Sequence, residues 1–118
     1  MMNNNALREN IVNDIIIWID ENVDKPLDIE IISERAGYSK WHFQRIFKHV
    51  VGVNLGEYIL NIRLLKVSSD LKKTNDKIID IAFRYGFDSQ QELNRAFKRI
   101  LKVTPGKYRK ETVLRYDA

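Results

Sequence analysis

The chain contains an internal repeat, in which residues 39–58 align with residues 89–108 when the sequence is shifted by fifty positions. Seven of these twenty positions are identical. The identical pairs are Ser39 and Ser89, Arg45 and Arg95, Phe47 and Phe97, Lys48 and Lys98, Val53 and Val103, Gly56 and Gly106, and Tyr58 and Tyr108. A glycine, Gly37 or Gly86, lies shortly before the serine in each copy. Each copy therefore predicts a short helix, a glycine-containing turn and a serine-capped second helix, which is the layout of a helix-turn-helix unit.

Apolar side chains recur at three- and four-residue spacing along most of the chain, which predicts an all-α fold of about seven helices. We expect helices over residues 7–22, 28–36, 39–51, 55–71, 77–85 and 89–102, a last turn near Tyr108, and a frayed tail from Glu111. The expected N-caps are Asp28, Ser39, Asn54 and Ser89. We expect two helix-turn-helix subdomains, residues 1–53 and 74–118, joined by a long central helix at 54–73. The second subdomain would end in a short helix and a tail.

Two further expectations concern the core. Trp18 lies on the apolar stripe of the first helix, so we expect it to be buried. In the central helix we expect the buried stripe to consist of Tyr58, Ile59, Ile62, Leu65 and Leu71.

The second helix of each copy has a polar, basic face opposite its apolar stripe. At about 100° per residue, Trp41, Gln44, Arg45 and Lys48 lie opposite Phe43, Ile46, Phe47 and Val50. The corresponding side chains in the second copy are Gln91, Asn94, Arg95 and Lys98. Arginine can bind guanine, glutamine or asparagine can bind adenine, and an apolar surface can contact the thymine methyl group. Because a central helix of roughly 17 residues is about 25 Å long, one chain could place two such helices one DNA turn apart.

The charge distribution also favours a polyanionic partner. Residues 1–71 carry eight Lys and Arg against ten Asp and Glu, whereas residues 72–118 carry twelve against six. The chain has no cysteine, its two histidines (His42 and His49) lack metal-site spacing, and we find no phosphate loop or nucleophile elbow. We therefore expect no cofactor, no metal and no enzymatic activity. The longest apolar run is Ile15–Ile19 and no signal peptide is evident, so we expect a cytoplasmic protein.

The second copy, YGFDSQQELNRAFK at 85–98 followed by VTPGKYR at 103–109, resembles the signature of the AraC/XylS family of bacterial transcription regulators. The first copy, GYSKWHFQRIFK at 37–48, is similar to the small MarA/SoxS/Rob group of that family. The resemblance covers about residues 8–110. It implies seven helices, binding of a monomer to an asymmetric promoter site, and recruitment of RNA polymerase to activate stress and multidrug-resistance promoters. Larger members add a ligand domain, and we expect none here.

The resemblance also implies roles for individual residues. Trp41, Gln44 and Arg45 would contact bases in one groove segment, and Gln90, Gln91, Asn94 and Arg95 in the next. The expected phosphate contacts are Ser39, Lys40, Lys48, Ser89, Lys98, Arg99, Lys102 and Arg109. Leu60 stands where relatives carry a basic residue, which removes one expected phosphate contact. Glu92 lies at the edge of the second face, where we expect it to cap its helix and to weaken DNA binding.

A second hypothesis is a helical protein-interaction module, an anti-regulator that keeps the fold but has lost DNA affinity. Acidic or apolar residues at 41, 44, 45, 91, 94 and 95 would favour it. The residues present are Trp, Gln, Arg, Gln, Asn and Arg, which favour DNA recognition.

Overall fold

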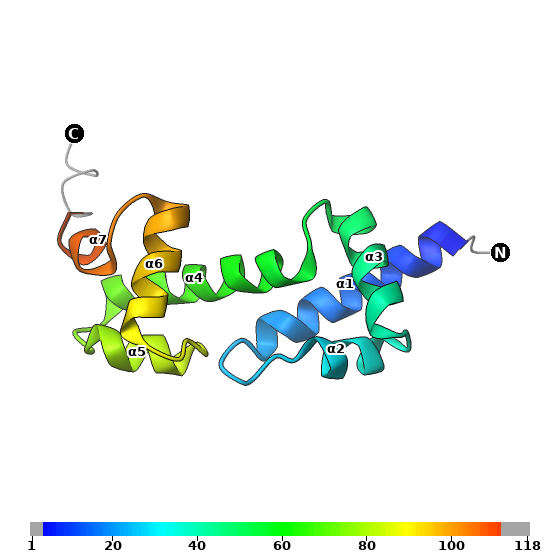
Figure 1. The fold of residues 1–118 in the computed structure, drawn as a ribbon, viewed down its shortest axis with the longest axis horizontal. Helices are drawn as coiled ribbons and strands as arrows, with labels where there is room; N and C mark the ends of the chain where they lie inside the picture. The colour runs from blue at the N-terminus through cyan, green and yellow to red at the C-terminus, as the bar shows by residue number, and fades with distance from the viewer. Residues whose placement is uncertain (1–3, 112–118) are drawn as a thin grey trace. The chain divides into compact units, whose positions relative to one another are not determined.

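The computed structural model describes residues 4–111, which form seven α-helices and no strand (Figure 1). The helices are α1 (Asn4–Glu21), α2 (Ile29–Ala36), α3 (Lys40–Val51), α4 (Leu55–Lys73), α5 (Ile78–Arg84), α6 (Gln90–Leu101) and α7 (Pro105–Glu111). The all-α prediction is thus confirmed. None of these helices is long and apolar enough to cross a membrane.

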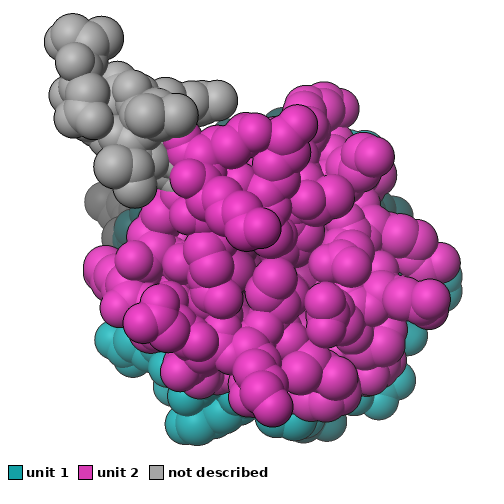
Figure 2. All heavy atoms as spheres, turned by 90° about the vertical axis from the view of Figure 1, so that its left-hand side faces the viewer, with its two compact units in different colours: residues 1–62 teal, residues 63–118 magenta. Residues whose placement is uncertain are grey.

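The chain divides into two compact units, residues 1–62 and residues 63–118 (Figure 2). The helix α4 is continuous (Figure 1), and the boundary falls inside it, so residues of α4 belong to both units. The first unit contains α1, α2 and α3, and the second contains α5, α6 and α7. Each unit therefore holds one copy of the sequence repeat on its own core.

The core of the first unit forms where α2 and α3 pack on each other and on α1. It is built from apolar side chains that are almost inaccessible to water, namely Val12, Ile15, Ile19, Ile32, Phe43, Ile46, Phe47, Leu55 and Ile59. Trp18, which we expected in this core, is only half-buried. Its ring lies beneath the guanidinium of Arg35, whose Cζ is 4.9 Å from the ring centroid. The tryptophan thus packs at the edge of the core, where a cation covers its outer face.

The core of the second unit lies between the C-terminal part of α4 and helices α5 to α7. Its buried side chains are Leu64, Val67, Leu71, Ile81, Ala82, Phe87, Leu93, Phe97 and Pro105. The predicted stripe of α4 was wrong at Leu65, which is 63% exposed, whereas Leu64 and Val67 are buried. The buried positions of α4 change register between Ile59 and Leu64, because the helix contributes to two cores.

An aromatic pair recurs at equivalent places in the two units. The rings of Phe47 and Tyr58 meet edge to face with centroids 5.4 Å apart and planes at 70°. Phe97 and Tyr108 do the same at 5.4 Å and 68°. In each unit the tyrosine comes from the helix that follows the repeated one, so the pair fixes that next helix against α3 or α6.

Short-range side-chain contacts set most helix starts. Each of the four expected caps accepts a backbone N–H near the start of its helix: Asp28 from Glu30, Ser39 from His42, Asn54 from Glu57 and Ser89 from Glu92. The last helix is longer than the predicted single turn, since α7 continues to Glu111 after Thr104 caps it through the Lys107 N–H. The frayed tail was expected from Glu111, but Glu111 still belongs to α7, and the rest of the expected tail lies outside the described residues.

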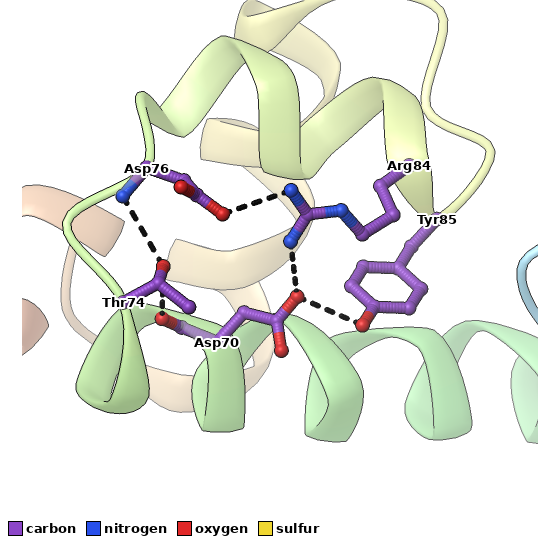
Figure 3. A network of polar contacts seen from close by, with 5 residues as sticks. All are labelled: Asp70, Thr74, Asp76, Arg84 and Tyr85. Carbon is purple, nitrogen blue, oxygen red and sulfur yellow. Dashed lines mark hydrogen bonds and ion pairs between the residues drawn. The ribbon is translucent and has the colours of Figure 1, made fainter.

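A polar network joins α4, α5 and the loop between them (Figure 3). The carboxylate of Asp70 accepts hydrogen bonds from Arg84 Nη1 at 2.6 Å and from the Tyr85 hydroxyl at 2.8 Å. The second nitrogen, Arg84 Nη2, donates to Asp76 at 2.9 Å. Thr74 accepts the Asp76 N–H and donates to the Asp70 carbonyl. These bonds hold α5, the first helix of the second helix-turn-helix, on the end of α4.

Candidate nucleic-acid interface

The turn between α2 and α3 fixes the start of the first reading helix. Gly37 adopts a left-handed conformation (φ 82°) and its N–H caps α2 by donating to Glu34 and Ser33 carbonyls. Ser39 then opens α3. Trp41, in the first turn of α3, is 77% exposed. An indole exposed to this degree is not held by packing, and it is therefore available to a partner.

The polar face of α3 borders a shallow hollow of about 450 Å³. Its lining consists of Trp41, Gln44, Arg45, Lys48, His49 and Asn54. All four side chains of the predicted face are among these residues, and no carboxylate lines the hollow. Gln44 keeps one weak bond, from its Nε2 to the Lys40 carbonyl at 3.3 Å. These four residues (Trp41, Gln44, Arg45 and Lys48), which we call the α3 reading face, thus combine an indole ring, an amide and two cations.

In the second unit the turn before α6 is held by Arg63. Gly86 has a φ of 87°, and a Cβ built there would lie 3.0 Å from Arg63 Cζ, so the guanidinium rests directly on the turn. Burial lowers the pKa of Arg63, and the charge of Glu92 acts in the opposite direction. The Glu92 carboxylate accepts the Asp88 N–H at 3.0 Å. Glu92 therefore caps α6, as expected, with its charge turned toward the helix start.

The α6 reading face (Gln91, Asn94, Arg95 and Lys98) repeats the arrangement with different chemistry. Gln91, Asn94 and Arg95 line a hollow of about 270 Å³. Gln91, Arg95 and Lys98 are exposed, and Asn94 is half-buried. Gln90 is half-buried at the first position of α6 and does not line the hollow. The second face therefore carries more amides than the first and no tryptophan.

The predicted phosphate-contacting residues fall into two groups. Lys40, Lys48, Lys98, Arg99 and Lys102 are exposed on or beside the two reading helices. Lys40 lies 3.9 Å from Glu30, a separation at which an exposed ion pair contributes little. Ser39 and Ser89 are N-caps, each accepting a backbone N–H through its hydroxyl oxygen. Their hydroxyl protons can still be donated.

Arg109, the last of the predicted phosphate contacts, has a contact within the protein. Its Nε donates to the Leu71 carbonyl at 3.0 Å, and its Nη2 is buried. The guanidinium thus donates a hydrogen bond to a carbonyl near the end of α4. The sequence did not predict this structural role. The contact of Arg109 with phosphate stays a prediction.

Sequence reasoning also missed a group of basic side chains beside the α3 reading face. Arg8 of α1 joins His42, Arg45 and His49 of α3 around a pocket of about 190 Å³. Residues 4–111 contain no cluster of metal-binding side chains, so the two histidines lie in a basic group and not in a metal site. The spacing of the histidines and Arg45 along α3 did not identify the group by itself, because the position of Arg8 depends on how α1 packs against α3.

The fold and the two repeated faces define a double helix-turn-helix protein, and comparison with known proteins gives its family. A family model described as "Helix-turn-helix domain" matches residues 32–111. With the relatives below, this match shows that the chain belongs to the AraC/XylS family of DNA-binding transcription regulators. It is a family of regulators and not of enzymes.

The chain is similar to several characterised members. It is 47% identical over 98 residues to the multiple antibiotic resistance protein MarA of Escherichia coli K12, covering 83% of this chain and 77% of MarA. It is 41% identical to the HTH-type transcriptional activator AarP of Providencia stuartii, covering 86% of this chain and 76% of AarP. Among solved structures, the DNA-binding domain of AdpA in complex with a target DNA superposes with a TM-score of 0.83 at 25% identity, covering 90% and 96%.

Proposed function

We propose that this chain regulates transcription by binding an asymmetric promoter site as a monomer, with α3 and α6 in two successive major-groove segments. One observation carries the proposal. Arg45 and Arg95, at the same position of the repeat, are both exposed and both line a hollow without carboxylates. A protein that binds two stretches of DNA needs a cationic surface facing each of them, and both repeats provide one.

The two faces suggest how bases are recognised. On α3, Arg45 is suited to a bidentate contact with guanine, Gln44 to adenine, and the exposed Trp41 ring to a thymine methyl group. On α6, Gln90, Gln91 and Asn94 are suited to adenine, and Arg95 to guanine. Because the faces differ in chemistry, the two DNA segments should differ in sequence, and the full site should be asymmetric.

Phosphate contacts would orient each helix in its groove. Lys48 and Lys98 occupy equivalent positions, and Lys40, Arg99 and Lys102 extend the cationic surface at the ends of α3 and α6. The N-cap hydroxyls of Ser39 and Ser89 lie at helix N-termini, where the backbone favours anions. We expect these contacts to set affinity and salt dependence, with base contacts setting specificity.

The relatives suggest the biological setting. One is named a multiple antibiotic resistance protein and another a transcriptional activator. We therefore propose a cytoplasmic activator of stress and multidrug-resistance promoters that has RNA polymerase as its partner. Recognition through side chains needs no cofactor.

Selection of bound sequences from a random DNA pool with purified protein tests this function. We expect an asymmetric consensus with two boxes about 10 base pairs apart, bound in a one-to-one complex. With six to ten phosphate contacts, affinity should fall roughly 10³- to 10⁵-fold between 50 and 200 mM salt. A palindromic consensus bound two-to-one would contradict the monomeric mode. Failure to enrich any sequence, together with a flat salt response, would instead support the protein-interaction module.

A further inference from the structure

We infer that the pocket between α1 and α3, lined by Arg8, His42, Arg45, Ile46 and His49, binds a phosphate group of the DNA backbone beside the first recognition helix. The inference rests on the proposed function and extends the interface to α1, which lies before the helix-turn-helix. We call this site the Arg8 pocket.

The lining of the Arg8 pocket has the chemistry of an anion site. Its four polar side chains are two guanidiniums and two imidazoles, and no carboxylate lines it. Within residues 4–111, the side chains of Arg8, Arg45 and His49 make no hydrogen bond or ion pair. Gathering like charges without a counter-charge is unfavourable, and an anionic ligand would remove that cost. Imidazole can donate a ring N–H in either protonation state, and guanidinium is suited to phosphate oxygens.

The packing of the first unit brings this set together. Helix α1 packs on α3, so Arg8 reaches the edge of α3 that carries His42, Arg45 and His49. The ring of Tyr38 meets that of His42 edge to face, with centroids 5.0 Å apart. The core residue Ile46 lies on the same edge and is 5% exposed. The pocket therefore rests on packed helices and does not depend on a loop.

The position of the pocket favours DNA over a free anion as the source of the phosphate. Arg45 and His49 line both the Arg8 pocket and the hollow at the α3 reading face. An α-helix in the major groove has rows of phosphates on either side, so a group adjoining the reading face meets the backbone. The second repeat has Glu92 and Arg99 at the positions of His42 and His49. Because the Glu92 carboxylate would repel phosphate, we assign the pocket to the first unit alone.

The first test compares Arg8→Gln with Lys25→Gln, which removes the same charge from an exposed position of the first unit outside the pocket. Arg8→Gln should lower affinity about 3- to 10-fold for cognate and scrambled duplexes alike, and should reduce the salt slope by about one. Lys25→Gln should change affinity less than about twofold, as for a charge outside the contact region. Circular dichroism melts verify that both variants fold.

A second measurement locates the contact. Duplexes with one neutral methylphosphonate at successive positions across the first box should show one position at which wild-type affinity falls. At that position, neutralising the phosphate should cost Arg8→Gln less affinity than it costs the wild type, because one of the interacting charges is already absent. If the affinity lost through Arg8→Gln and the affinity lost through the methylphosphonate add at every position, Arg8 does not contact the backbone and the inference is wrong.

Titration with inorganic phosphate, followed by the ring C–H NMR signals of His42 and His49, distinguishes the two sources of phosphate. If Arg8→Gln and Lys25→Gln behave alike on DNA while phosphate saturates the histidine signals, the pocket holds a free anion and the DNA assignment is wrong. If the two variants behave alike and phosphate moves neither signal, no phosphate site exists. If the wild-type protein binds no duplex at all, the proposed function itself fails.

Discussion

Lys102 ends α6 in the same left-handed backbone conformation in which Gly52 ends α3, fifty residues earlier. The φ angles are 65° and 92°, and each residue donates its N–H to a carbonyl four residues back, at 2.9 Å. Glycine adopts this conformation without penalty, whereas a side chain costs on the order of 1 kcal/mol. Lys102 is the one non-glycine residue with positive φ in residues 4–111. The second unit therefore has a lysine with a strained backbone at the position where the first unit has a glycine.

Replacing Lys102 should separate stability from binding. We expect Lys102→Gly to raise the free energy of unfolding by about 1 kcal/mol, because the strain disappears. The same variant should bind DNA more weakly and with a salt slope smaller by about one, since a proposed phosphate contact is lost. Urea denaturation and binding titrations measure both quantities. Gly52→Ala is the matched control and should destabilise by about 1 kcal/mol. A less stable Lys102→Gly variant would refute the assignment of strain.

The recurring aromatic pairs should contribute equally in the two units. We expect Phe47→Leu and Phe97→Leu each to lower the free energy of unfolding by about 1–2 kcal/mol, through lost packing and the lost edge-to-face contact with tyrosine. Trp41→Leu, at an exposed position, should change it by less than about 0.5 kcal/mol while weakening DNA binding. Chemical denaturation measures these differences. A large loss of stability for Trp41→Leu would mean that the indole is a packing residue.

The local parts of this fold could be predicted from sequence. Asp28, Ser39, Asn54 and Ser89 cap helices through contacts within three residues, so composition and spacing suffice to identify them. The division of the buried positions of α4 between two cores could not be predicted, because Leu64 and Leu65 are equally apolar and only tertiary packing distinguishes them. The same reason explains why the sequence did not reveal the partners of Trp18 and Arg109. Their partners, Arg35 and the Leu71 carbonyl, lie 17 and 38 residues away.

The reading faces follow from helical periodicity, which places Arg45 and Arg95 opposite Phe47 and Phe97 whatever the surroundings. The Arg8 pocket does not, because it depends on how α1 packs against α3. Sequence alone showed two histidines seven residues apart, and that spacing became informative only once a guanidinium from another helix was beside them.

The Asp70 network should affect the titration of Tyr85. Burial and the hydrogen bond to Asp70 raise the pKa of Tyr85 above its ordinary value of 10.0. The stability that this group contributes is therefore fully present below pH 10 and is lost as pH rises through the higher folded-state pKa. Ultraviolet absorbance of phenolate should show Tyr85 ionising late in the wild type and earlier in Asp70→Asn. Tyr85→Phe identifies its signal, and an unchanged titration in Asp70→Asn would count against the network.

Coupling of the two recognition helices through α4 can be tested by changing its length. Two alanines inserted between Ile62 and Arg63, at the boundary of the two units, should rotate one unit by about 200° relative to its original direction. Helicity measured by circular dichroism should persist, whereas affinity for the full site should fall toward that for a single box. Full-site binding equal to that of the wild type would show that the two units do not depend on this helix.

The most direct test of the account measures binding of Arg45→Ala and Arg95→Ala to every single-base variant of the selected site. Arg45→Ala should cost about 1–3 kcal/mol and abolish preference at one base pair of the first box. Arg95→Ala should cost less, because its face has less apolar contact area, and should relax preference at one base pair about 10 base pairs away. Both variants should melt like the wild type, since both side chains are exposed. If the variants lose affinity equally for all sequences, or melt earlier with base preferences intact, then α3 and α6 are not the helices that read the DNA.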